Sequence, residues 1–217
     1  PIERSQAVDD AYRVNQGEVL IVSAALGLMA NDVIPGGRSG VVRLVGMGPS
    51  AANVGVLTLN ENGSLSFVPV AAHRGRVTFQ YDLEVVETQT TRATVVIDVN
   101  GRPTAIDDAA TTGVGVPVDV DVLDNDTDPE GDALVVGGLV EPPNHGSIAV
   151  EDGVIYSPDP GFEGVDTFAY EACDVWGACA SARVTVTVGE VDRLMGLDDA
   201  AETPEDVPVL IRVADND

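Results

Sequence analysis

The chain has 217 residues, of which 44% are hydrophobic, 36 are acidic and 11 are basic, for a formal net charge of −25. This apolar content is enough for one large or two small folded domains, and so acidic a surface is a poor partner for nucleic acid. The longest apolar run, the 12 residues from Val19 to Ala30, is too short to cross a bilayer as a helix.

An internal repeat organises the chain. The segments AVDDAYRVNQGEVLIV at 7–22, AIDDAATTGVGVPVDV at 105–120 and GLDDAAETPEDVPVLI at 196–211 share one pattern. Further along, GSLSFVP matches GVIYSP, GRVTFQY matches GVDTFAY, and ATVVIDV matches ARVTVTV. We therefore predict one domain over 1–102, a second over 103–190, and the start of a third over 191–217.

The hydrophobic period within each unit is two residues, which is typical of half-buried strands. In chain order, the second unit should form strands at 109–112, 117–123, 134–138, 147–150, 154–157, 166–172 and 180–188. The pairs Asn62-Gly63 and Asp152-Gly153 are hairpin turn signals between such strands. The predicted fold class is all-β, with tandem seven-stranded Greek-key immunoglobulin-like sandwiches.

The segment DVLDNDTDPEGDAL at 121–134 holds six carboxylates. Following the strands up and down the predicted sandwich places three acidic segments at one end: the linker pair, this loop, and the hairpin between the last two strands. Like charges gathered in this way destabilise a fold unless a cation neutralises them. Calcium accepts six to eight oxygen ligands from flexible loops, whereas magnesium demands stricter geometry. The predicted calcium ligands are Asp107, Asp108, Asp124, Asp126, Asp128, Glu130, Asp132 and Asp174.

Other interpretations of this acidity remain open. Most charge runs are simply solvated. Arg74 and Arg76 of the first unit could pair with the carboxylates, although exposed pairs contribute only ~0–1 kcal/mol. Zinc is disfavoured because His73 and His145 lie in different units. Asp166 should lie at the opposite end, where we expect it to cap its turn.

The three units differ in charge. Residues 1–101 carry ten acids and seven bases, a net −3, whereas residues 102–190 carry 18 acids and two bases, a net −16. The first unit keeps Asp9-Asp10 and Asn31-Asp32 but has VIPGGRSG in place of the acidic loop. The third unit repeats the acids that would form the next junction, namely Asp198, Asp199, Asp215 and Asp217.

Cys173 and Cys179 flank a predicted hairpin turn and can face each other across it, which favours a disulfide and a location outside the cytosol. Trp176, the sole tryptophan, lies at the tip of that hairpin, either as an exposed contact or as a cover for the end of the sandwich. His145 and Ser147 lack a nucleophile elbow, so we expect no enzyme.

The second unit reads PVxxxVLxNDTDPEGDxL, PxHGS, YSPxxGFxGxDxFxY and CDxxGxCxxARVTVTV. These motifs resemble the tandem bacterial immunoglobulin-like or cadherin-like repeats of large secreted and surface adhesins, of the RTX-adhesin type. The resemblance implies extracellular arrays that calcium stiffens at domain junctions. The expected partners are neighbouring repeats of the same chain. Alternatively, the first repeat itself binds a cell-surface protein or glycan, or residues 200–213 donate a strand to a filament.

Overall fold

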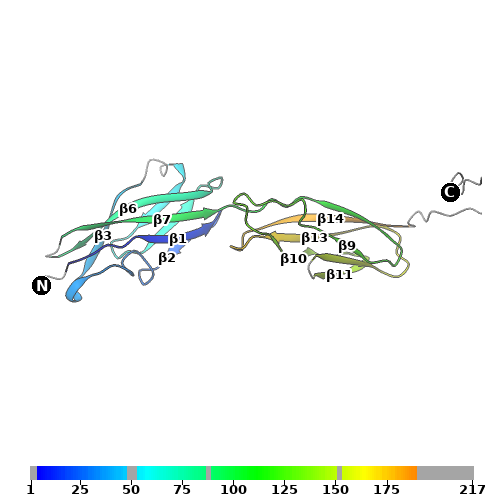
Figure 1. The fold of residues 1–217 in the computed structure, drawn as a ribbon, viewed down its shortest axis with the longest axis horizontal. Helices are drawn as coiled ribbons and strands as arrows, with labels where there is room; N and C mark the ends of the chain where they lie inside the picture. The colour runs from blue at the N-terminus through cyan, green and yellow to red at the C-terminus, as the bar shows by residue number, and fades with distance from the viewer. Residues whose placement is uncertain (1–3, 48–52, 87–88, 151–152, 190–217) are drawn as a thin grey trace, which may run out of the picture.

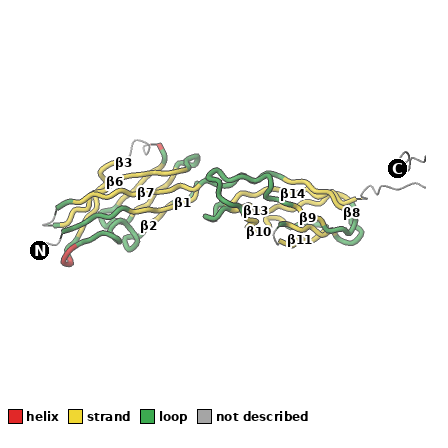
Figure 2. The backbone as a smooth tube through the Cα atoms, in the orientation of Figure 1, coloured by secondary structure: helices red, strands yellow, loops and turns green. Residues whose placement is uncertain are grey.

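The computed structural model describes residues 4–47, 53–86, 89–150 and 153–189. Two elongated β-sandwiches lie end to end, joined by a short connection (Figure 1). Strands run along most of each sandwich and loops gather at its two ends (Figure 2). The predicted acids of the third unit, Asp198, Asp199, Asp215 and Asp217, and the segment 200–213 lie outside the described residues.

The first sandwich has seven strands in two sheets. One sheet has the order β1-β7-β6-β3 and the other the order β2-β5-β4. A 3-10 turn, η1, lies at Pro35–Gly37. The strands are β1 (Asp10–Asn15), β2 (Leu20–Val22), β3 (Gly40–Met47), β4 (Gly55–Leu59), β5 (Leu65–Pro69), β6 (Gly75–Val85) and β7 (Thr91–Asn100).

The second sandwich repeats this topology. Its four-stranded sheet has the order β10-β13-β14-β8, and its three-stranded sheet has the order β11-β12-β9. In both sandwiches the first strand pairs in parallel with the last. The strands are β8 (Asp108–Gly113), β9 (Val118–Val120), β10 (Val135–Glu141), β11 (Gly146–Val150), β12 (Val154–Pro158), β13 (Gly164–Cys173) and β14 (Cys179–Gly189).

Each sandwich has its own core, built from the inward residues of alternating strands. In the first repeat, Phe67 and Tyr81 are fully buried between the sheets, and Tyr156 and Tyr170 are fully buried in the second. These alternating burial patterns confirm the predicted all-β fold and its period of two. In the described ranges, no helix is long and apolar enough to span a membrane.

The strand boundaries differ from the prediction mainly beside the acidic loop. The strand expected over 117–123 is shorter, at Val118–Val120, because the chain turns where Val122 N–H donates to the Val120 carbonyl. The strand expected over 134–138 occurs at Val135–Glu141, with register shifts between Val136 and Gly138 and between Leu139 and Glu141. Gly138 lies there at φ 157°.

Candidate functional site

The connection between the repeats runs along the acidic loop of the second one. Thr104 and Thr127 exchange two backbone hydrogen bonds, of 2.7 and 3.0 Å. Gly101 N–H donates to the Glu130 carboxylate at 3.0 Å. A Cβ at position 101 would lie 2.5 Å from the ring of Pro129, so only glycine fits there without displacing the loop. The linker, the loop and the end of the first repeat therefore form one junction.

Three of the predicted ligands hold the first strand of the second repeat in place. Asp126 accepts hydrogen bonds from Ile106 N–H at 2.8 Å and from the Tyr170 hydroxyl at 2.9 Å. Asp107 accepts from Arg183 N–H at 2.9 Å, and Asp108 accepts from the Asn125 amide at 2.9 Å. These carboxylates tie the entering strand to the loop after β9 and to β14.

The first repeat has the same cluster, although it lacks the acidic loop. Asp32 accepts from Val8 N–H at 2.8 Å and from the Tyr81 hydroxyl at 2.9 Å. Asp9 accepts from Thr94 N–H at 2.7 Å, and the Asn31 amide donates to the Asp9 carbonyl at 3.1 Å. The cluster is present in the second repeat, which has the acidic loop, and in the first, which lacks it. We therefore infer that the cluster supports the fold of each sandwich.

Each cluster also contains one crowded carboxylate. Burial and the neighbouring Asp32 raise the pKa of Asp10 to about 6, against the lowering effect of hydrogen bonds from nearby side chains. Burial likewise raises the pKa of Asp108, with Asp126 adding to the effect. Within the described part of the chain, Asp10 Oδ2, Asp108 Oδ2 and Asn125 Oδ1 are buried without a hydrogen-bond donor.

The remaining acids of the loop lie toward the first repeat or toward solvent. Asp128 Oδ1 accepts from Glu130 N–H at 2.9 Å and from Asp132 N–H at 3.1 Å, which closes the turn. Its Oδ2 is buried, and no donor in the described ranges reaches it. Glu130 and Asp132 line a cleft of about 290 Å³ between the repeats, whereas Asp124 is exposed.

Asp174 lies in the β13–β14 turn and contacts the first repeat. Its Oδ1 accepts from Trp176 N–H at 2.8 Å and from Ala178 N–H at 3.0 Å, and its Oδ2 accepts from the Asn100 amide at 2.7 Å. Its side chain is therefore committed to hydrogen bonds on both oxygens. Trp176 is 47% exposed and stacks beneath Arg13 of the first repeat, with the Arg13 Cζ 3.1 Å from the ring centroid.

Asp166 caps a turn at the opposite end of the sandwich, as the sequence predicts. It accepts from the backbone N–H groups of Asn144, His145 and Thr167 and from the Tyr156 hydroxyl, at 2.8 to 3.0 Å. Burial raises the pKa of this carboxyl, but the four hydrogen bonds outweigh it and the pKa lies below its usual value.

Two other predictions from the sequence can be located in the structure. Cys173 and Cys179 form the predicted disulfide across β13 and β14. Arg76 borders the cleft between the repeats but pairs with Asp98 of its own repeat at 2.9 Å. Both side chains of that pair are well exposed, so the pair contributes little to stability.

The ligand atoms of the predicted calcium site do not form a tight group as they stand. In the described ranges, the only three acidic, histidine or cysteine side chains with ligand atoms within 4.8 Å of one another are Glu171, Cys173 and Cys179. The two sulfurs of that group are joined in the disulfide, so it offers no thiolate for a metal.

The model of the bacterial Ig domain family matches this sequence twice in tandem, over residues 2–98 and 100–187. The chain belongs to the bacterial Ig domain family. The two matches cover the two sandwiches seen in the structure, one for each repeat. No curated protein sequence matched the chain.

Three of the solved structures that match the chain are at most 17% identical to it. The three extracellular domains EC1-3 of Drosophila N-cadherin are 11% identical over 87% of this bacterial Ig chain and 68% of their own, with a TM-score of 0.34. The N-terminal eight Ig domains of Down Syndrome Cell Adhesion Molecule are 15% identical over 86% of this chain and 24% of their own, with a TM-score of 0.45. An endo-fucoidan hydrolase of glycoside hydrolase family 107 is 17% identical over 83% of this chain and 27% of its own, with a TM-score of 0.33. The chain therefore spans about a quarter of that protein.

The acids could be identified from the sequence, but the side chains that bind them or complete the junction could not. Tyr170 and Asn125 complete the cluster of the second repeat, and Asn100 and Arg13 contact the next repeat. One signal was available: the Asn-Asp pair is present in both repeats even though the rest of the acidic loop is not. The contacts of Asn100 and Arg13 left no such signal.

Proposed function

We propose that this pair of bacterial Ig domains is a structural repeat module of an extracellular adhesin, and that calcium stiffens the junction between its repeats. The observation that carries the proposal is the set of buried oxygen atoms without a donor at the acidic end of the second repeat. Asp108 Oδ2, Asn125 Oδ1 and Asp128 Oδ2 are all of this kind. Buried acceptors are normally satisfied by a donor, a water or a cation.

The chemistry of these groups suits calcium. Carboxylate and amide oxygens from an irregular loop are the ligands that this ion prefers. The net charge of −16 on residues 102–190 adds long-range attraction for a divalent cation. The ligands that we propose beside the linker are Asp128, whose Oδ2 lacks a donor in the described ranges, and Glu130 and Asp132, which line the cleft. Asp126 and Asp174 already accept hydrogen bonds on both oxygens, which makes them weaker candidates than the sequence alone suggests.

Calcium would act by drawing the loop together. The ligand oxygens are spread out, so an ion that gathers them would restrict the acidic loop and, through Glu130 and Gly101, the linker. Extracellular modules often have dissociation constants of about 10⁻⁴ to 10⁻³ M for calcium, so the stiffness of the junction would follow the calcium content of the surroundings.

Calorimetric titration tests this proposal. We expect saturable calcium binding with a dissociation constant of about 10⁻⁴ to 10⁻³ M, and little response to magnesium. The double variant Asp128→Asn, Asp132→Asn should lose it, because amides lack the charge that holds the ion. The control Asp119→Asn, Asp159→Asn removes the same charge from exposed positions elsewhere on the second repeat and should bind as the wild type does.

If the Asp128→Asn, Asp132→Asn variant still binds calcium, the ion must lie at another site. The absence of binding up to several millimolar calcium would leave the acidic loop as a solvated surface.

The disulfide and the family membership support an extracellular location, because disulfides persist outside the reducing cytosol. We also propose that the module is not catalytic. His145 stacks on Phe162 with ring centroids 4.4 Å apart, and its backbone N–H and carbonyl bind Asp166 and Tyr156. These contacts suit a turn residue better than a general base.

Ligand binding by the first repeat is a second candidate function, and one surface favours it. Ile21 is 79% exposed and Val56 is 68% exposed, and both lie with Val68 on the outer face of the β2-β5-β4 sheet. On the corresponding face of the second repeat, Asp119 lies opposite Ile155, and Ser147 lies opposite Ser157.

A cell-binding or glycan-array assay tests this candidate. The variant Ile21→Thr, Val56→Thr should lose binding that the wild type shows, because it removes the two most exposed apolar side chains of this face. Val165→Thr, at an exposed valine of β13, serves as the control. A wild-type chain that binds nothing in either assay contradicts the candidate.

A further inference from the structure

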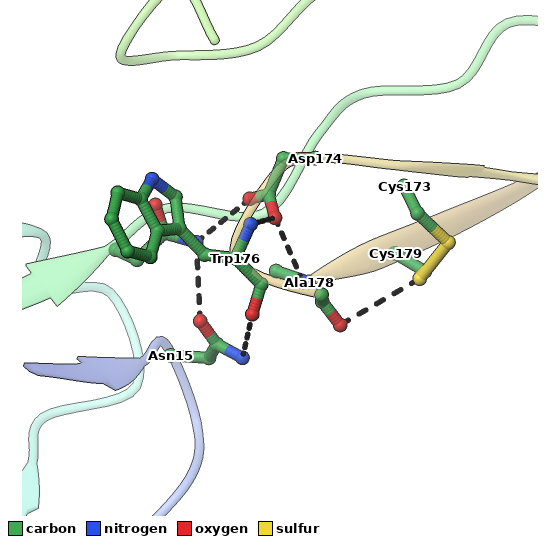
Figure 3. Close-up of a disulfide and its surroundings, with 8 residues drawn as sticks. Asn15, Cys173, Asp174, Trp176, Ala178 and Cys179 are labelled. Carbon is green, nitrogen blue, oxygen red and sulfur yellow. Dashed lines mark hydrogen bonds between the residues drawn. A yellow bond between two sulfur atoms is a disulfide. The ribbon is translucent and has the colours of Figure 1, made fainter. Parts of the chain in front are cut away.

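The tip of the β13–β14 hairpin is braced by contacts within its own repeat. Asp174 Oδ1 caps the turn by accepting from two backbone N–H groups, and Asp174 N–H itself donates to the Ala178 carbonyl at 3.0 Å. Gly177 supplies the positive φ of 79° that the turn requires. The disulfide closes the last pair of the hairpin immediately behind it, as Figure 3 shows. The tip can therefore dock as a preformed unit.

Two asparagines of the first repeat receive this tip. Asn15 and Asn100 are register partners at the ends of β1 and β7, so they lie side by side at the junction. The Asn100 amide donates to Asp174 Oδ2 at 2.7 Å and to Asn15 Oδ1 at 3.2 Å. The Asn15 amide then donates to the Trp176 carbonyl at 3.4 Å (Figure 3). Asn100 and Asp174 are 6% and 4% exposed, so their bond is shielded from water.

Arg13 completes the contact on the outside. It lies two residues before Asn15 on the same face of β1, and its guanidinium covers the indole of Trp176. A cation over an indole face is the most favourable cation–π pairing. The hairpin tip is thus held by a buried hydrogen bond at its base and a stacked cation at its end.

Neither repeat carries both halves of this contact. The positions of Arg13, Asn15 and Asn100 are occupied in the second repeat by Thr111, Gly113 and Gly189, and Gly113 pairs with Gly189 as Asn15 pairs with Asn100. Conversely, counting along the matched β6 and β13 sequences, the first repeat has Val85 and Glu87 where the second has Asp174 and Trp176. The first repeat can receive such a tip but cannot offer one.

We propose that Arg13, Asn15 and Asn100 form a socket specific for an Asp-X-Trp hairpin tip of the following repeat, and that this socket sets the order and orientation of the two repeats without a metal. The second repeat has glycines at the socket positions, so it could not receive such a tip. This pairing does not depend on the proposed calcium site, because its donors and acceptors are complete within the two repeats.

The test uses the whole chain in EDTA. NMR relaxation measures how each repeat tumbles, and acrylamide quenching reports on Trp176, the sole tryptophan. We expect the wild type to tumble as one body. The variant Arg13→Thr, Asn100→Ala should show two separate correlation times and faster quenching with a red-shifted emission. The matched control Arg43→Thr, Asn144→Ala changes the same residue types at exposed positions away from the junction and should behave as wild type.

Two results would overturn the proposal: separate tumbling of the wild type in EDTA, or unchanged tumbling and quenching in the socket variant. If Asn100→Ala disturbs folding, Trp176→Ala removes the ring that Arg13 covers, breaks the contact from the other side and keeps the tumbling measurement. A chain that binds no calcium yet tumbles as one body would support the socket and contradict the calcium proposal, so the two can fail separately.

Discussion

Replacing Asp166 with alanine is expected to lower the free energy of unfolding of the second repeat by about 3–5 kcal/mol. The side chain is 3% exposed and accepts four hydrogen bonds, three from backbone N–H groups and one from the Tyr156 hydroxyl. Truncation leaves four donors without an acceptor in a site that water reaches poorly. Asp166→Asn keeps one carbonyl oxygen and should cost less.

Urea unfolding followed by the fluorescence of Trp176 measures this loss, since that residue lies in the second repeat. Asp119→Ala, at an exposed position of β9, provides the control and should unfold as the wild type does. A change below about 1 kcal/mol for Asp166→Ala would mean that the turn rearranges to satisfy its own donors.

The same residue predicts an acid-sensitive second repeat. The pKa of Asp166 is lower in the folded chain than its unfolded value near 3.8. Its contribution is therefore fully present above that unfolded value and is lost as the pH falls through the lower folded one. The wild type should lose stability in this range more steeply than Asp166→Asn does.

The first repeat is expected to show the opposite pH dependence through Asp10. Its pKa of about 6 in the folded state exceeds the unfolded value of 3.8, so the neutral form is favoured by folding. The corresponding stability is fully present below the unfolded pKa and is lost as the pH rises through about 6. A shift of this size corresponds to about 3 kcal/mol as an upper bound.

Asp10→Asn should therefore stabilise the first repeat at neutral pH by about 1–3 kcal/mol and flatten its pH dependence. Hydrogen exchange of the β6 and β7 amides reports on this repeat separately. Asp9→Asn is the matched control, because Asp9 is exposed and its Oδ1 acceptor is retained in the amide. A destabilised Asp10→Asn would mean that the charge itself is required, as it is for a cation ligand.

The fold could be predicted in some detail from the sequence. The strands expected at 166–172 and 180–188 occur at Gly164–Cys173 and Cys179–Gly189, because alternating burial imposes a period of two on long strands in a sandwich. The short β9 was predicted less well, since its end is set by a local backbone hydrogen bond. Parallel pairing of the first and last strands leaves no periodic signal.

By itself, the sequence determined the tandem repeat, the β-sandwich, the disulfide and the concentration of acid in the second unit. Each of these follows from patterns local to the chain. Only the tertiary structure decided which acids do what: Asp126 anchors a strand, Asp174 binds Asn100, and Asp128 keeps an oxygen without a donor. Those roles depend on backbone N–H and amide groups that lie far away along the chain, and residue type alone does not reveal such partners.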